Sequence, residues 1–246
     1  MRTLDFKDVV YGTAQLAGLD RDNLPGHFFK QVRDFANTRL AIAWETEYWP
    51  ETMKIVERTV TTSNDISTMD YPTDAGEVLE IYSKNPKKTT NLDIVSYVLH
   101  DTGADSDDNV GKSVVVYSTT TPLFMEYKKA RPELVGDVNV TTALVQGDQI
   151  YSDGNFWEAK TARNAGTHQP IESDGTVDST NWSKILIPKI FQNYLIRGIY
   201  SDYLRANGQL EAASIEDNNA NGMLVMESDK LYRQQGQVRT TKMVTY

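Results

Sequence analysis

The amino-acid sequence predicts an α+β fold: a helical bundle formed by the N- and C-terminal helices, with an antiparallel β excursion and a small all-β inserted module. Three observations predict it. Apolar residues recur at helical spacings in 1–50 and 187–236, short β-branched and aromatic runs fill 51–135, and an Asp-Gly turn joins two strand-like runs in 136–186. Because helices come first and return last, we expect one interrupted bundle rather than independent domains.

The N-terminal part of the chain contains two predicted helices. The first spans residues 4–18 and ends in a turn. The second begins near Asn23, a favourable N-cap residue, has Pro25 in its first turn and stops at Pro50. We expect Arg39 to lie on a wetter face of this helix. Its apolar face consists of Leu24, Phe28, Val32, Phe35 and Ile42, and it is widened by Phe29, Ala36, Leu40 and Trp44.

The C-terminal part is predicted to be helical again. One helix starts at Pro188, carries Tyr194 and Tyr203, and closes at an Asn-Gly pair. A second helix follows from 209 to 235, with Leu210, Ala213, Ala220, Leu224 and Leu231 on one face. The last ten residues, 237–246, contain Arg239 and Lys242 and no acidic residue. We expect them to form an extended tail.

Between these helical ends, the β region is predicted to be an antiparallel sandwich or barrel. Its strand-like runs are short and are bounded by Asn, Asp, Gly, Pro or Thr, which favour turns. Strands of this length and spacing are typical of all-β architectures. The predicted strands cover 53–60, 77–82, 94–99, 112–117 and 123–127.

Composition excludes several chemistries. The 246 residues include no cysteine, which excludes disulfides, Cys-ligated zinc, Fe–S clusters and thiol nucleophiles. The chain carries 25 Lys and Arg against 34 Asp and Glu, a formal charge of −9, so it lacks the basic surplus of a protein that wraps nucleic acid. No apolar run approaches the length of a membrane span. We therefore expect no enzymatic activity, no cofactor, no metal and no membrane partner.

Local motifs agree with a non-catalytic chain. Gly111-Lys112-Ser113 has the ending of a phosphate-binding loop, but Ser106 stands where the motif needs glycine and a strand follows. The acidic loop 101–109 could offer oxygen ligands to calcium, but it lacks EF-hand spacing, which favours a solvated loop. The three histidines lie far apart and form no recognisable catalytic set.

The inserted module has the most specific local pattern. It reads as strand, Asp153-Gly154 turn, strand, followed by a late Trp182. This pattern resembles the small chitin-binding modules of carbohydrate-active enzymes, although the longer loop 164–180 departs from it. The resemblance implies that Tyr151, Trp157 and Trp182 stack on sugar rings. The alternative is that the aromatic side chains are the core of a tiny β domain, where a few large residues must supply most of the burial.

A second resemblance covers the two helical ends. The run Tyr-Ser-Asp-Tyr-Leu-Arg-Ala-Asn-Gly-Gln at 200–209 is followed by a long helix that closes on Arg-Gln-Gln-Gly-Gln at 233–237, and the chain ends Val-Thr-Tyr at 244–246. This looks like the C-terminal end of the head-to-tail adaptors of tailed bacteriophages. The region 28–49 is similar to the N-terminal helix of such neck proteins.

This resemblance implies a structural, non-enzymatic protein. Adaptors form a homo-oligomeric ring, usually a dodecamer, between the portal protein and the tail or stopper protein. DNA passes through the ring without sequence-specific binding, and an acidic channel suits that passage. The implied location is the neck of the virion, assembled in the cytoplasm of the bacterial host. The alternative is a carbohydrate-binding virion or accessory protein that uses the 136–186 module.

Two sets of residues follow from the adaptor resemblance. A closed ring needs two different contact faces on each subunit, and aromatic residues are enriched at such interfaces. The expected bundle core or subunit interface consists of Phe28, Phe35, Trp44, Tyr194 and Tyr203. The tail is expected to contact the portal or an adjacent subunit, as an added strand. The contact residues in that tail are Arg239, Lys242, Val244 and Tyr246.

Overall fold

The computed structural model describes residues 2–89, 93–101, 112–172 and 174–234. The chain is divided into two compact units. The terminal unit comprises Met1–Glu47 and Pro132–Tyr246, and the central unit comprises Tyr48–Arg131. Helices and antiparallel sheets are both present, so the predicted α+β class is confirmed.

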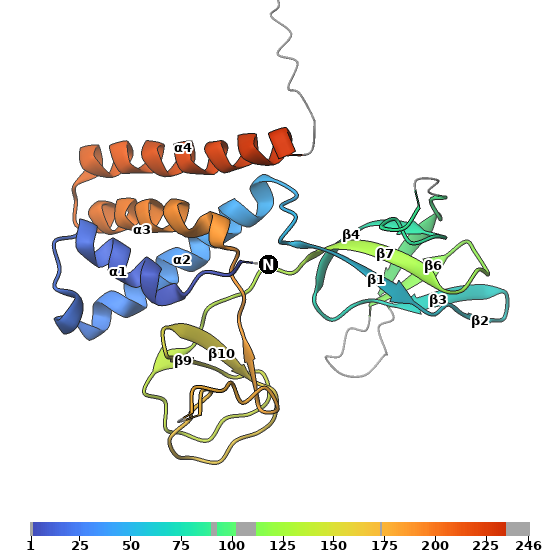
Figure 1. The fold of residues 1–246 in the computed structure, drawn as a ribbon, viewed down its shortest axis with the longest axis horizontal. Coiled ribbons are helices and arrows are strands. Elements are labelled where there is room, and N and C mark those ends of the chain that lie inside the picture. Colours follow the sequence, from blue (N-terminus) through green and yellow to red (C-terminus); the bar gives the residue numbers. More distant parts are fainter. Residues whose placement is uncertain (1, 90–92, 102–111, 173, 235–246) are drawn as a thin grey trace, which may run out of the picture. The chain divides into compact units, whose positions relative to one another are not determined.

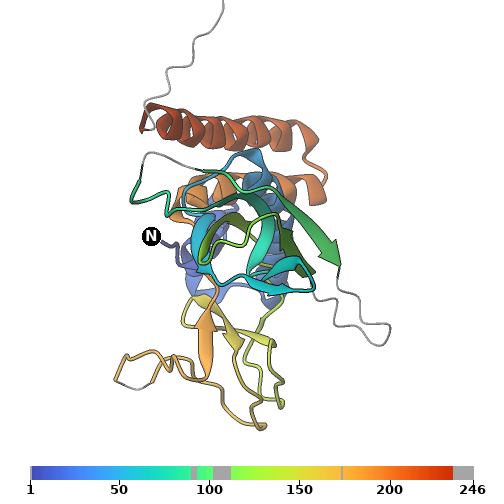
Figure 2. The same cartoon turned by 90° about the vertical axis from the view of Figure 1, so that its right-hand side faces the viewer.

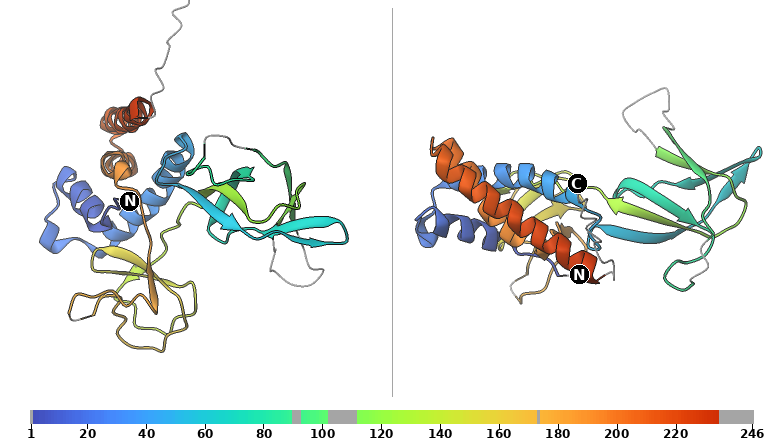
Figure 3. Two further views of the ribbon diagram at one scale, coloured as in Figure 1. Left: turned by 45° about the vertical axis from the view of Figure 1, so that its right-hand side comes forward. Right: turned by 90° about the horizontal axis from the view of Figure 1, so that it is seen from above.

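The four α-helices of the described chain all belong to the terminal unit (Figure 1). Helix α3 packs against each of the other three, and α4 lies along its outer side in the views of Figures 1 and 3. Segments from the two ends of the chain therefore share one helical layer. The helices are α1 (Phe6–Leu16), α2 (Gly26–Thr46), α3 (Gln192–Ala206) and α4 (Leu210–Gln234).

The start of α2 differs from the prediction. Asn23 does not cap it, because that residue ends the short 3-10 helix η1 (Arg21–Asn23). Proline disfavours a helical conformation in the residue before it, and Leu24 is extended, so Pro25 takes the N-cap position instead. The helix then ends at Thr46, ahead of Pro50. In the same way, η2 (Lys189–Phe191) precedes α3, which starts at Gln192 rather than near Pro188.

Two positions on α2 differ from the prediction, although most of the predicted apolar face is buried. Ile42 is 48% exposed, whereas Arg39 is only 5% exposed, and both predictions were wrong. Ala36 and Leu40 are buried as predicted, and so is Ala43, which the prediction did not include. The physical reason lies in α3 and α4, which supply carboxylates to Arg39, as described below. On α4, Leu210 is exposed as well, although it was placed on the inner face.

The central unit consists of two antiparallel sheets (Figures 1 and 2). One sheet has the order β1-β7-β4 and the other β2-β3-β6-β5. Side chains of both sheets form one core, with Ile81 and Met125 from the first and Met69 and Val114 from the second. The strands are β1 (Met53–Arg58), β2 (Thr61–Ser63), β3 (Ile66–Asp70), β4 (Ala75–Tyr82), β5 (Tyr97–Asp101), β6 (Lys112–Val116) and β7 (Leu123–Lys129).

Two features of these sheets were not predicted from the sequence. The hairpin β2–β3 was not predicted, because its strands are rich in Ser and Thr rather than aliphatic residues; Asn64 and Asp65 form its turn with positive φ angles of 50° and 62°. The predicted strand 94–99 is interrupted. Ile94 makes only an isolated bridge to Tyr82, and β5 begins at Tyr97.

The β module lies within the terminal unit and has the strand order β11-β10-β9-β8. Its hairpin turns at Asp153 and Gly154, whose φ angles of 50° and 79° suit an Asp-Gly turn between twisted strands. Leu144, Trp157 and Trp182 are among the side chains that form its core. The strands are β8 (Asp137–Val138), β9 (Gln149–Ser152), β10 (Asn155–Ala159) and β11 (Trp182–Lys184), with β8 parallel to β9.

Candidate functional site

The aromatic residues predicted for the bundle core or interface differ in burial. Phe28, Trp44 and Tyr194 are buried inside the terminal unit, at 1%, 3% and 1% exposure. Phe35 and Tyr203 are partly exposed, and the Tyr203 ring meets the Phe28 ring edge-on at 5.7 Å. The first three therefore serve the interior of one chain. The predicted tail contacts Arg239, Lys242, Val244 and Tyr246 lie outside the described residues.

A buried ion network joins three of the helices. Arg39 of α2 donates two hydrogen bonds, each 2.7 Å long, to the two carboxylate oxygens of Asp202 in α3. Its remaining terminal nitrogen lies 2.6 Å from Oδ1 of Asp217 in α4. Arg205 approaches both acids from the solvent side. A planar guanidinium suits such bidentate contacts, and two carboxylates compensate for taking its charge out of water.

The electrostatics of this network favour the charged arginine. Burial by itself would lower the pKa of the Arg39 guanidinium, but its hydrogen bonds to Asp202 and Asp217 outweigh that effect, and the pKa is raised. Burial raises the pKa of the neighbouring Tyr194 hydroxyl. Both shifts keep Arg39 charged and Tyr194 neutral near neutral pH.

Gly198 makes room for this network. A Cβ atom built on Gly198 would lie 2.9 Å from Cδ of Arg39, closer than real Cβ contacts allow. The glycine thus lets α3 pass directly beside the arginine stem. One feature of the sequence indicates this arrangement: Arg39 stands among Ala36, Leu40 and Ala43, which are all buried, whereas Ile42 is exposed.

The β module is attached to α1 and α2 by an aromatic cluster. Phe6 of α1 lies 4.9 Å from Phe156 of β10, and Phe29 of α2 lies 4.5 Å from Tyr151 of β9, measured between ring centroids. Burial raises the pKa of the Tyr151 hydroxyl. Because these rings belong to both the module and the helices, the module shares a core with the helices.

Polar contacts reinforce this attachment. Arg33 of α2 lies 2.6 Å from Asp137 at the start of β8. Asn37 exchanges two hydrogen bonds of 2.8 Å with the backbone of Leu134, one through each end of its amide. At the other side of the module, Lys184 donates to Asp5 at 2.9 Å. Each contact joins residues far apart in sequence, and none was predicted.

The residues predicted to stack on sugar rings are not arranged for that purpose. Trp157 and Trp182 are 2% and 1% exposed and lie in the core of the module, so neither offers a ring face to solvent. The Trp157 indole nitrogen donates to the Ser152 carbonyl. Tyr151 is partly exposed, but its ring packs in the cluster with Phe6, Phe29 and Phe156. For these rings the structure favours the core interpretation.

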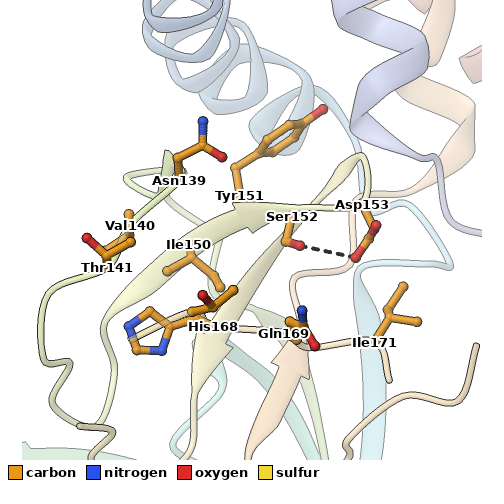
Figure 4. A pocket seen from close by; sticks show the side chains of 11 residues that line it. Asn139, Val140, Thr141, Ile150, Tyr151, Ser152, Asp153, His168, Gln169 and Ile171 are labelled. Atoms are coloured by element: carbon orange, nitrogen blue, oxygen red, sulfur yellow. Dashed lines mark hydrogen bonds between the residues drawn. The ribbon is translucent and has the colours of Figure 1, made fainter. Parts of the chain in front are cut away.

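The module nevertheless carries a hollow of about 530 Å³ (Figure 4). The Ser152 hydroxyl donates to the Asp153 carboxylate at 3.1 Å, and His168 Nε2 lies 2.8 Å from the Thr142 carbonyl. Figure 4 shows the Tyr151 ring turned toward the helices, away from His168. The lining is mostly uncharged and polar, with one carboxylate. It includes Asn139, Val140, Thr141, Ile150, Tyr151, Ser152, Asp153, Thr167, His168, Gln169 and Ile171.

In the central unit, two carboxylates share one phenol. The Tyr82 hydroxyl lies 2.8 Å from Glu126 and 2.5 Å from Glu80, and these two acids are opposite each other on β4 and β7. Burial, followed by the hydrogen bonds to the two carboxylates, raises the pKa of Tyr82. The phenol therefore stays protonated and bridges two strands that carry like charges.

Other binding classes find no support in the described ranges. Within them, no three His, Asp or Glu side chains come together in a way that could hold one metal ion. None of the helices described has the length and apolarity needed to span a bilayer. Residues 102–111, which contain most of the acidic loop and Gly111, lie outside the described residues.

Comparison of the chain with protein-family models found no match, and comparison with curated proteins found none either.

Proposed function

We propose that the chain is a structural head-to-tail adaptor of a tailed bacteriophage. It forms an oligomeric ring between the portal and the tail or stopper protein, and DNA passes through the channel. One observation supports this most. The resemblance rests on two segments, 28–49 and 200–237, and residues 28–47 of the first and 200–234 of the second lie in the same unit, where α2, α3 and α4 meet around Arg39. The two halves of the resemblance thus describe one piece of structure.

The charge of the chain is compatible with this role. A formal charge of −9 disfavours tight binding to phosphates, and weak binding suits a channel that DNA must cross. In this proposal the helices act as the bundle from which the ring is built, and the chain performs no catalysis. The central unit and the β module are additions to that bundle. The protein is assembled in the host cytoplasm and ends in the neck of the virion.

The first experiment tests ring formation. The full chain is mixed with its purified portal protein and examined by native mass spectrometry and negative-stain electron microscopy. We expect closed rings of one stoichiometry bound to the portal. A chain that remains free of the portal over the whole concentration range would overturn the adaptor proposal.

The second experiment tests the tail. Deleting 237–246 is expected to abolish the joining of filled heads to tails while the helical circular dichroism is unchanged. The double charge reversal Arg239→Glu/Lys242→Glu should weaken joining strongly. Its matched control is Lys87→Glu/Lys88→Glu, which makes the same charge change on exposed residues of the central unit. If the truncated chain still joins heads to tails, the tail has no docking role.

A second candidate function uses the hollow of the module. Amides, hydroxyls and one carboxylate beside apolar side chains are groups that bind saccharide hydroxyls, and Asp153 and Gln169 contribute to this lining. Calorimetric titration with chitin oligosaccharides tests it. Binding that is lost in Asp153→Ala and Gln169→Ala, and retained in the module control Asp174→Ala, would support a carbohydrate-binding role. Absence of heat with the full chain would exclude that ligand.

A further inference from the structure

The outer face of α4 carries exposed apolar side chains on both sides of its midpoint, together with the exposed Asn218 and Asn219. Ile215, Val225 and Met226 are 62%, 55% and 55% exposed, and the helical period places them on the side opposite Ala213, Ala220 and Leu224, which are buried. Figure 3 shows α4 seen nearly end-on, with α3 on one side of it only. A surface helix with one buried face needs no apolar residues on its other face, so a partner surface is indicated.

Gly222 lies at the centre of this face. A Cβ atom built there would meet nothing within 4 Å, so no contact inside the chain requires a glycine. Glycine inside a helix costs about 1 kcal/mol relative to alanine, and its usual benefit is the close approach of another backbone. Because Gly222 has no side chain, nothing projects from the helix at the centre of this face.

Charges mark the two ends of the same face. Glu211 and Arg233 are both exposed, and they stand eleven residues before and eleven residues after Gly222. At the rise of an α-helix, each is therefore about 16 Å from the glycine. Neither side chain has an ion-pair partner among the described residues; Arg233 Nε donates only to the Asp229 carbonyl. Along this face the order is therefore acid, apolar, two asparagines, glycine, apolar, a second acid (Asp229) and base.

We propose that this face binds the same face of a second copy, with the two α4 helices antiparallel about a two-fold axis at Gly222. The axis brings Glu211 beside the partner's Arg233 at both ends and glycine against glycine at the centre. Ile215 then lies near the partner's Met226. Asp229, one turn before Arg233, adds a second carboxylate beside that arginine.

The charges determine the direction of pairing. A parallel pair in register would put Glu211 against the partner's Glu211 and Arg233 against the partner's Arg233, which is repulsive. In the antiparallel pair both contacts are attractive, and the dipoles of the two helices are also antiparallel, which is favourable. A two-fold contact uses the same surface on both chains, so it closes at two copies.

This inference does not rest on the adaptor proposal. Ring contacts are head-to-tail and use two different surfaces, so the α4 pair is a separate assembly. If both proposals hold, the pair is the form of the free protein, and the ring is built through other faces of the terminal unit.

Analytical ultracentrifugation of the full chain tests the pairing. We expect a monomer–dimer equilibrium. Each single reversal, Glu211→Arg or Arg233→Glu, creates two repulsive contacts and should raise the dissociation constant by about tenfold or more. The double reversal Glu211→Arg/Arg233→Glu restores both attractions and should return the constant to within about threefold of the original. Gly222→Leu should abolish the dimer.

Glu158→Arg, an exposed acid in the β module, is the matched control and should leave the dissociation constant unchanged. Circular dichroism and the unfolding midpoint show that each variant is folded. A monomer at every concentration overturns the proposal. So does a dimer that is insensitive to Gly222→Leu, or a double reversal that is folded yet no better than the single ones. The portal-binding experiment tests the adaptor proposal independently of this one.

Discussion

Replacement of Arg39 by methionine tests the buried network most directly. Methionine keeps most of the length of the side chain and removes the charge and all five donors. Asp202 and Asp217 then lose the cation that compensates them, and their side chains keep only 14% and 30% exposure. The two carboxylates, from different helices, then keep Arg205 as a cation near them, at 3.1 Å from Asp202 and 3.9 Å from Asp217.

The expected loss follows from the burial of the three groups. Removing one partner of a buried ion pair typically costs about 3–5 kcal/mol. Water reaches Asp217 more easily than Arg39, so we expect the lower end, about 3 kcal/mol, from the free energy of unfolding. That is a large part of the roughly 5–15 kcal/mol that stabilises a typical domain. Arg39→Lys keeps the charge but not the fork of donors, and it should lose about 1–2 kcal/mol.

Urea unfolding followed by helical circular dichroism measures these values. The helices of the described chain all belong to the terminal unit, so this signal reports on that unit separately from the sheets. The triple variant Arg39→Met/Asp202→Leu/Asp217→Leu also removes the two uncompensated carboxylates. It should recover at least half of the lost free energy of unfolding. A loss below about 1 kcal/mol for Arg39→Met, or no recovery in the triple variant, would refute this account of the network.

Four further substitutions test the terminal unit. Gly198→Ala should destabilise the unit by about 1–2 kcal/mol because the added Cβ collides with Arg39. Gly222→Ala, measured at a concentration where the chain is monomeric, should instead stabilise it by about 0.5–1 kcal/mol. Equal effects of the two substitutions in urea unfolding would contradict the collision. Trp157→Phe loses the bond to the Ser152 carbonyl and should cost about 1–2 kcal/mol by thermal unfolding; a neutral result would show that this bond is unimportant. The hydrogen bond from Lys184 is the main cause that lowers the pKa of Asp5. A lowered folded-state pKa contributes stability above the unfolded value, about 4, and that stability disappears as the pH falls through the folded value. Lys184→Met should therefore cost up to about 1 kcal/mol near neutral pH and almost nothing at pH 2, and a pH-independent cost would argue against the ion pair.

The local patterns succeeded where neighbouring residues decide the structure. The Asp153-Gly154 hairpin, the strands on either side of it and the helices at both ends follow from turn chemistry and periodicity. The hairpin β2–β3 was missed because its strands are polar and short, and its pairing with β6 is a long-range event.

The candidate sites depended much more on distant partners. The indoles of Trp157 and Trp182 fit a sugar-binding pattern in sequence, yet the structure uses them as core. The hollow beside Asp153 brings together residues 139–141, 150–153 and 167–171, and no local spacing indicates that they meet. A pattern of residue types shows which side chains are available, whereas burial shows which of them a ligand can reach.

The sequence by itself determined the α+β class, the order of helices and strands, and the exclusion of cysteine chemistry. Only the tertiary structure decided the burial of Arg39 in α2 and the packing of the β module on α1 and α2. The reason is physical. Burying the charge of Arg39 is unfavourable until Asp202, 163 residues further along the chain, is brought against it. Hydrophobic periodicity contains no information on that partner, so the inward position of this arginine follows from the completed fold.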